Sequence, residues 1–169
     1  MKKIKIIIVV VLLLAIGLSI FFVLKDKVGT KNYQNSNFKV SYDTTWNVKN
    51  DKDELYLIHK KTKSELKIQC KLLDTNFIDT SLKDIIDDII YSIENQNDGY
   101  VLINRSDNVS DKYESYSYLY ENNEKQVLVN LYKKDAKLIV VYYEAESKYY
   151  DIVLDSVNII LDSLEVVFE

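Results

Sequence analysis

The sequence contains few side chains that could catalyse a reaction near neutral pH. His59 is the one histidine in the chain, and histidine has the unperturbed pKa best suited to a general base. It follows the apolar stretch 55–58 and precedes two lysines, so it falls at the end of a predicted strand. Many Ser and Asp residues are available as partners, but no nucleophile-elbow motif accompanies them. A hydrolase that depends on His59 and a strand-end surface histidine are both open interpretations, and the pattern favours the second.

Thiol and metal chemistry have little support in the sequence. The single cysteine excludes an intramolecular disulfide and any metal site built from several cysteines. Cys70 falls on the apolar face of an alternating strand, where an inert buried thiol is expected. Asp84, Asp87 and Asp88 share one side of a predicted helix and could bind a hard cation, but such spacing is more typical of a solvated helix face. We therefore predict no metal site and no cofactor.

Tyrosine is abundant, with 14 copies, and some of these side chains could form a binding surface. By strand parity, Tyr113, Tyr132 and Tyr143 fall on the face opposite the one that carries Tyr116 and Tyr118. A helix or solvent must cover that face, and exposed tyrosines offer a partner a large amphipathic contact surface. We predict Tyr113, Tyr132 and Tyr143 as contacts for a protein or an envelope component.

Two kinds of periodicity predict the elements that position these residues. Apolar residues alternate with polar ones, as in half-buried strands, over residues 38–42, 46–48, 55–58 and 66–72. Ser81 and Asp84 form a capping box, and isoleucines at helical spacing continue a helix to residue 93. A second helix begins near Ser147 and is expected to direct Tyr149 and Ile152, among others, toward the core. Residues 164–168 are expected to end the chain as a short strand.

The segment around residues 116–142 predicts two consecutive hairpins. If Asn122 and Asn123 form a two-residue loop, Tyr118 lies opposite Val127 on the neighbouring strand. A second turn near residues 134–135 then places a third strand whose apolar residues share the same face. Because three strands agree on one face, the pattern predicts an α+β fold with a mainly antiparallel sheet flanked by two helices.

The N-terminal segment has the pattern of a membrane anchor. An uncharged apolar run over residues 6–24 is long enough, at about 1.5 Å per residue, to cross a hydrocarbon core of roughly 30 Å. We expect it to contact the lipid bilayer through side chains such as Ile6, Leu13, Phe21 and Leu24. The run is longer than the apolar region of a cleaved signal peptide, and no small-residue cleavage site follows it. We therefore predict a single-pass transmembrane helix, with a cytoplasmic N-terminus and an extracytoplasmic C-terminal domain.

These patterns divide the chain into three parts. Residues 1–24 are predicted to be the anchor, residues 25–36 a polar tether, and residues 37–169 a folded domain. The formal net charge of −4 opposes binding to nucleic acid, so we predict no nucleic-acid partner.

The start of the predicted domain resembles the PsbP/Mog1-like superfamily. Residues 38–46 are similar to that family's opening pattern of aromatic, aliphatic and aromatic residues at alternate positions before a Trp, with Asp43 where the family usually has Pro. The isoleucine-rich helix, and the closing strand followed by a helix, are similar as well. The resemblance implies an antiparallel sheet between helices. It also implies the function of most family members, which are non-enzymatic accessory or binding proteins and include membrane-anchored bacterial proteins.

Three functional hypotheses follow. The leading one is a non-enzymatic, membrane-anchored extracytoplasmic domain that binds a protein or an envelope component. The second is a small-ligand sensor or carrier with a pocket between sheet and helix. The third is a hydrolase that depends on His59.

Overall fold

The computed structural model describes most of the chain beyond its N-terminal segment. The described residues are 29–50, 54–95, 99, 101–109, 112–122 and 124–167. The chain divides into two compact units, residues 1–31 and residues 32–169. The predicted anchor over residues 6–24, with Ile6, Leu13, Phe21 and Leu24, lies outside the described residues. In the described part of the chain, no helix is long and apolar enough to cross a membrane.

A small three-stranded sheet pairs the first two strands of the domain with the last one. Its order is β1 (Lys31–Gln34), β2 (Phe38–Tyr42) and β10 (Glu165–Val166). The Asn35 side chain stabilises the turn between β1 and β2. Its Oδ1 accepts hydrogen bonds from the backbone N–H groups of Asn37 and Phe38 at 2.8 and 2.9 Å. The structure thus corrects the interpretation of residues 25–36 as tether, because residues 31–34 form a strand. The predicted C-terminal strand is confirmed as β10.

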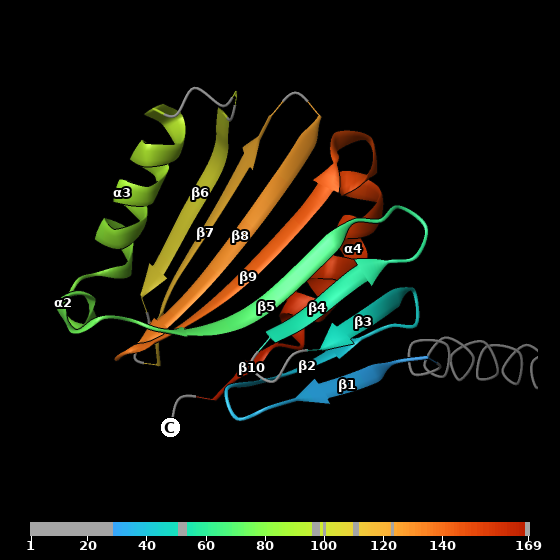
Figure 1. The fold of residues 1–169 in the computed structure, drawn as a ribbon, viewed down its shortest axis with the longest axis horizontal. Helices are drawn as coiled ribbons and strands as arrows, with labels where there is room; N and C mark the ends of the chain where they lie inside the picture. Colours follow the sequence, from blue (N-terminus) through green and yellow to red (C-terminus); the bar gives the residue numbers. More distant parts are fainter. Residues whose placement is uncertain are drawn as a thin grey trace, which may run out of the picture. The chain divides into compact units, whose positions relative to one another are not determined.

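A seven-stranded antiparallel sheet forms the centre of the domain (Figure 1). Its strands in spatial order are β3 (Trp46–Asn50), β4 (Glu54–His59), β5 (Glu65–Leu72), β9 (Lys137–Glu146), β8 (Lys125–Lys134), β7 (Glu114–Glu121) and β6 (Val101–Val109). Every neighbouring pair is antiparallel. The predicted α+β class is confirmed. The sequence interpretation missed β6, whose polar composition gives no alternating apolar signal.

The β7–β8 hairpin has a longer loop than predicted. Tyr118 lies opposite Val129, two residues beyond the expected Val127. The Asn122 side chain explains the wider turn, because its Oδ1 accepts hydrogen bonds from the backbone N–H groups of Glu124 and Lys125 at 3.3 and 3.0 Å. A shift of two residues leaves every side chain on its predicted face, so the assignment of faces is correct although the register is not.

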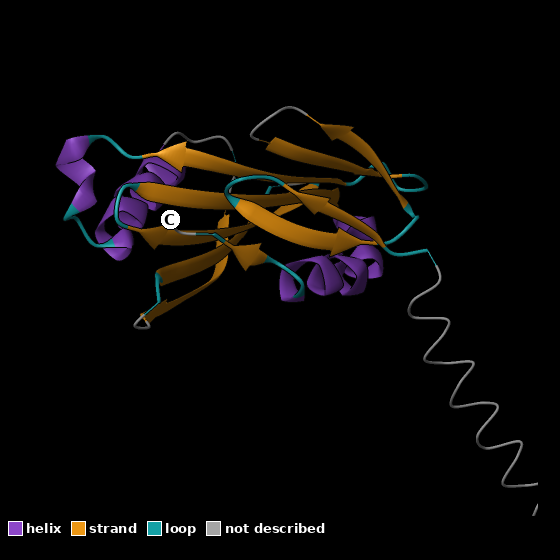
Figure 2. Ribbon diagram, turned by 90° about the horizontal axis from the view of Figure 1, so that it is seen from below, coloured by secondary structure: helices purple, strands orange, loops and turns teal. Residues whose placement is uncertain are grey.

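In the part of the chain that the structure describes, three helices accompany the sheets: α2 (Thr75–Ile78), α3 (Leu82–Asn95) and α4 (Ser147–Asp162). The two long helices α3 and α4 lie at different ends of the large sheet (Figure 2). In α4 the buried residues are Tyr150, Val153, Val157 and Ile160. The prediction for Ile152 was wrong, because its side chain is 70% exposed, and Tyr150 rather than Tyr149 faces the core.

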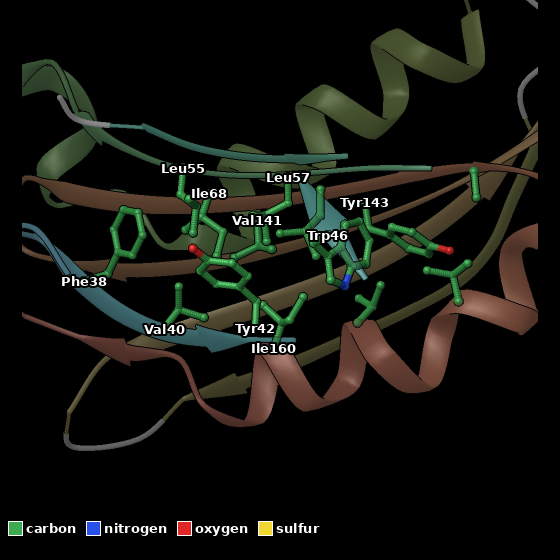
Figure 3. Close-up of a cluster of buried hydrophobic side chains, with 14 of the residues drawn as sticks. Phe38, Val40, Tyr42, Trp46, Leu55, Leu57, Ile68, Val141, Tyr143 and Ile160 are labelled. Carbon is green, nitrogen blue, oxygen red and sulfur yellow. The ribbon is translucent and has the colours of Figure 1, made fainter. Parts of the chain in front are cut away.

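The two helices bury opposite faces of the large sheet. On one face, α4 and β2 enclose a core that includes Phe38, Trp46 and Val141 (Figure 3). On the other face, Leu82 and Ile86 of α3 pack against tyrosines and valines of β7 and β8. Alternate residues of one strand therefore enter two separate cores, as the period of two requires. We call these the α4-side and α3-side cores.

Candidate functional site

A shallow polar groove lies on the surface of the large sheet where β6, β7 and β8 run side by side. It has a volume of about 250 Å³. Its polar lining residues include Ser106, Asn108, Ser115, Ser117, Asn130 and Tyr132. Two of them fix the face to which it belongs: Asn130 and Tyr132 lie opposite Val141 and Ile139, which are part of the α4-side core. The groove is therefore the continuation of the face that α4 covers farther along the sheet.

Uncharged hydroxyl and amide groups dominate this groove. Each serine hydroxyl both donates and accepts hydrogen bonds, and the Asn130 amide offers two donors and one acceptor oxygen. Of the described residues that line the groove, only Asp107 is charged. This composition suits a neutral ligand rich in hydroxyl or amide groups better than an ion.

The structure brings two of the three predicted tyrosines together at this site. The rings of Tyr113 and Tyr132 meet edge to face, with 5.6 Å between their centroids. Tyr132 is half-buried and packs against the α4-side core, and this burial raises the pKa of its phenol. Tyr132 thus provides a fixed aromatic wall to the groove, and Tyr113 lies against it.

The third predicted tyrosine, Tyr143, is a core residue. Its side chain is 1% exposed, its ring centroid lies 5.2 Å from that of Tyr150, and its hydroxyl donates to the Tyr150 carbonyl oxygen at 3.1 Å. Burial raises the pKa of the Tyr143 phenol, and that of Tyr150 to about 12. Strand parity placed Tyr143 on the correct face, but α4 covers it, so we withdraw it as a partner contact.

His59 belongs to the turn between β4 and β5. Its Nδ1 lies 2.8 Å from the Thr62 hydroxyl, which in turn lies 2.8 Å from the Ser64 hydroxyl. The Trp46 ring packs against the imidazole edge to face at 5.3 Å. Burial lowers the pKa of His59. Because Ser64 is only 3% exposed, its hydroxyl is enclosed by protein. These contacts stabilise a turn and give the hydrolase hypothesis no support.

Asp43 ties the start of the domain to α4. Its Oδ1 accepts a hydrogen bond from the Thr45 backbone N–H at 2.7 Å. Its Oδ2 accepts one from the Ser156 hydroxyl at 3.1 Å, and that hydroxyl accepts one from Trp46 Nε1 at 2.9 Å. The carboxylate at this position therefore closes the β2–β3 turn and also orients the Ser156 hydroxyl, whose oxygen satisfies the indole N–H of the buried Trp46.

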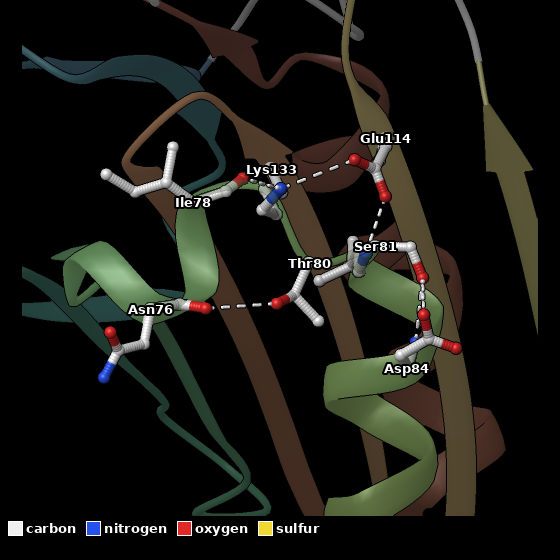
Figure 4. Close-up of polar contacts among 8 residues, drawn as sticks. Asn76, Ile78, Thr80, Ser81, Asp84, Glu114 and Lys133 are labelled. Carbon is white, nitrogen blue, oxygen red and sulfur yellow. Dashed lines mark hydrogen bonds and ion pairs between the residues drawn. The ribbon is translucent and has the colours of Figure 1, made fainter.

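Two of the three predicted acidic residues of α3, Asp84 and Asp87, make contacts within the domain, and Asp88 is exposed. Ser81 caps α3 as predicted: its Oγ accepts a hydrogen bond from the Asp84 backbone N–H at 3.1 Å and donates one to Asp84 Oδ2 at 2.7 Å (Figure 4). Asp87 pairs with Lys83 and lies 3.6 Å from Arg105, and the hydrogen bond from Lys83 holds the pKa of Asp87 below its usual value. Among the described residues, no group of His, Cys, Asp and Glu could hold a metal ion.

A buried lysine near the start of α3 was not predicted from the sequence. The Lys133 ammonium donates to the Ile78 carbonyl oxygen at 2.9 Å and lies 3.5 Å from Glu114 Oε1 (Figure 4). The other oxygen of Glu114 accepts from the Leu82 backbone N–H at 2.6 Å. The Glu114 carboxylate therefore bridges the ammonium and the first turn of the helix, where negative charge is favourable. The strand pattern alone gives no sign of this site.

A charged patch occupies part of the opposite face of the sheet. The Lys67 ammonium lies 4.8 Å from the centre of the Tyr56 ring and 3.6 Å from Glu65. Burial and the neighbouring Glu65 raise the pKa of Tyr56 to about 12. Glu144 pairs with Lys125 and accepts a hydrogen bond from a tyrosine hydroxyl. Lys67 and Lys125 are thus each paired with a carboxylate of the same patch.

Comparison with known proteins identifies the fold. No family model matches the sequence, and no curated protein matches it. The solved structure of CyanoP, the cyanobacterial PsbP of Synechocystis sp. PCC 6803, superposes with a TM-score of 0.63 at 16% identity, covering 82% of this chain and 93% of that one. The domain has the PsbP/Mog1-like fold. The predicted resemblance is confirmed at the level of the fold.

Two bacterial structures share the PsbP/Mog1-like fold. LpqN of Mycobacterium tuberculosis, described as involved in cell envelope biogenesis, gives a TM-score of 0.57 at 9% identity and covers 82% of this chain and 91% of that one. PA94 of Pseudomonas aeruginosa gives a TM-score of 0.52 at 11% identity and covers 77% of this chain and 92% of that one. At such low identity the likeness concerns the fold alone.

Proposed function

We propose that this protein is a non-enzymatic accessory domain that binds a component of the cell envelope in the polar groove. In this proposal residues 6–24 anchor it in the cell membrane and the domain lies on the extracytoplasmic side. The groove carries the proposal, because it joins uncharged hydroxyl and amide groups to the aromatic pair formed by Tyr113 and Tyr132.

The chemistry of the groove favours a glycan. Sugar hydroxyl groups require both donors and acceptors, which Ser117 and Asn130 can provide. The apolar faces of a sugar ring pack well on aromatic side chains, and Tyr132 stands beside these polar groups. LpqN, which shares the fold, is described as acting in cell envelope biogenesis, and this agrees with an envelope ligand.

The open, shallow form of the groove favours this function over that of a small-molecule carrier. Pockets that enclose a free ligand usually measure about 300–1,000 Å³ and bury most of its surface. A groove of about 250 Å³ on a sheet surface instead fits one or two units of a longer chain. We therefore favour attachment to a polymer over transport of a free molecule.

Calorimetric titration of the full-length protein, in detergent, with soluble peptidoglycan fragments tests this function. Ser117→Ala and Asn130→Leu remove hydrogen-bonding groups from the groove, and each should weaken binding about tenfold, the effect of roughly 1.4 kcal/mol. Lys49→Ala, on the charged face, is the matched control and should bind normally. No heat with the wild-type protein, or equal binding by all three variants, would overturn the proposal.

A further inference from the structure

Strand β6 leaves one edge of the large sheet open. It ends the strand order of the described sheet, and all of its residues except Leu102 are exposed. Ile103 and Val109 are 47% and 75% exposed. Natural proteins usually protect such an edge with lysines, prolines or a very short strand, because its free N–H and C=O groups can pair with another strand. Strand β6 contains neither lysine nor proline and spans nine residues.

The irregular part of β6 lies at one end. The register with β7 shifts between Leu102 and Asn104, and from Asn104 to Val109 the pairing is continuous. A bulge twists an edge away from other strands only locally. The regular stretch 104–109 is therefore available as a template for another strand.

The charges of this stretch are self-complementary. Arg105 is the one arginine in the chain, and Asp107 lies two residues farther along, so both point to the same face. When a strand pairs with an antiparallel copy of itself about Ser106, Arg105 of each copy lies directly opposite Asp107 of the other. The two ion pairs form on one face, with the planar guanidinium suited to a carboxylate.

We propose that β6 pairs with β6 of a second copy of this chain, antiparallel about a two-fold axis at Ser106. The residues select this register. An axis at Arg105 would oppose two arginines, and an axis at Asp107 would oppose two carboxylates. In the proposed register Asn104 lies opposite Asn108 of the second copy, and Ile103 comes level with its Val109.

Arg105 can take part without losing its present partner. Its guanidinium lies 3.6 Å from Asp87, and its side chain is 57% exposed. Because a guanidinium has five N–H donors, it can serve a second carboxylate as well. The pairing also brings together Ser106 and Asn108 of both copies, so two polar grooves become neighbours on one face of a continuous sheet.

Cysteine crosslinking of the full-length protein, in a Cys70→Ser background, tests the register. Residues opposite each other on antiparallel strands have Cα atoms about 4.5–5.5 Å apart, within reach of a disulfide. Ser106→Cys should therefore give a covalent dimer on mild oxidation. Asn104→Cys is the matched control. Residue 104 of one copy lies opposite residue 108 of the other, so the two copies of residue 104 are offset by four residues along the strands, about 13 Å. Adding Asn108→Cys to it should restore the crosslink. Equal crosslinking at 104 and 106, or none at 106, would overturn the proposal.

Charge reversal tests the ion pairs independently. Arg105→Asp and Asp107→Arg should each abolish the dimer measured by analytical ultracentrifugation, because each places like charges together twice. An equimolar mixture of the two variants should form a heterodimer, since one strand then carries two carboxylates and the other two cations. Circular dichroism of each variant checks that the fold is kept. A dimer that survives both single changes, or a mixture that stays monomeric while both variants fold, would contradict the proposal. Glycan binding enters neither experiment, so failure here leaves the proposed function untouched.

Discussion

Tyr143 and Tyr132 stand on the same face of the same sheet, yet one is core and the other lines a groove. Tyr143 lies on β9 beneath α4 and contacts Tyr150 of that helix. Tyr132 lies on β8, where it stays half-buried beside serine and asparagine side chains. The face of a strand residue follows from its parity, whereas its burial depends on where the covering helix crosses the sheet. A binding surface can thus arise where one helix is too short to cover a wide sheet.

Replacing Tyr143 is expected to have the largest effect. Tyr143→Ala should lower the free energy of unfolding by about 3–5 kcal/mol, because it leaves a cavity beneath α4. Urea unfolding followed by circular dichroism measures this loss. Ser117→Ala, on the open part of the same face, is the matched control and should stay within about 0.5 kcal/mol of the wild type. If Tyr143→Ala were equally mild, the distinction between covered and open regions would be wrong.

The sequence predicts the elements of this fold better than it predicts the site. Alternation placed Phe38, Val40 and Tyr42 on one buried face of β2, and the structure confirms them as core. The polar strand β6 was missed because an exposed edge strand needs no apolar face. The groove was not foreseen either, since Ser106 and Asn130 are far apart in sequence and meet only through the strand order. The placement of Tyr113 and Tyr132 near each other on this face agrees with strand parity, and their role as partner contacts stays a prediction.

Glu114 fixes the start of α3, the helix that covers the α3-side core. Glu114→Ala should lower the free energy of unfolding by about 2 kcal/mol, because it leaves the buried Lys133 ammonium and the Leu82 N–H without their carboxylate. Thermal and urea unfolding both report the loss. Glu124→Ala, an exposed carboxylate in the β7–β8 turn, is the control and should be nearly neutral. A neutral result at Glu114 would mean that the bridge to α3 contributes no stability.

A smaller effect is expected where α4 is tied over the covered region. Ser156→Ala should lower the free energy of unfolding by about 1 kcal/mol, because the Trp46 indole N–H and the Asp43 carboxylate lose their shared partner. Ser156→Thr keeps the hydroxyl and tests whether the loss is due to the hydrogen bonds. Near-ultraviolet circular dichroism follows the environment of the one Trp in the chain. If alanine and threonine behave alike, the hydroxyl does not fix the helix.

The smallest effect concerns His59, which borders the covered core through Trp46. Burial lowers its pKa in the folded state below the unfolded value of 6.5, and the charge of Lys61 lowers it further, whereas Asp43 opposes the shift. The unfolded chain therefore binds the proton more readily, so this contribution to stability is complete above about pH 7 and is lost as the pH falls below 6.5. His59→Gln should remove this pH-dependent contribution. Urea unfolding at pH 5 and pH 8 measures it, and the free energy of unfolding should differ less between the two pH values in the variant than in the wild type. An equal pH dependence in both proteins would contradict the lowered pKa of His59. If the wild type instead gained stability at pH 5 relative to the variant, pairing of the imidazolium with Asp43 would outweigh burial.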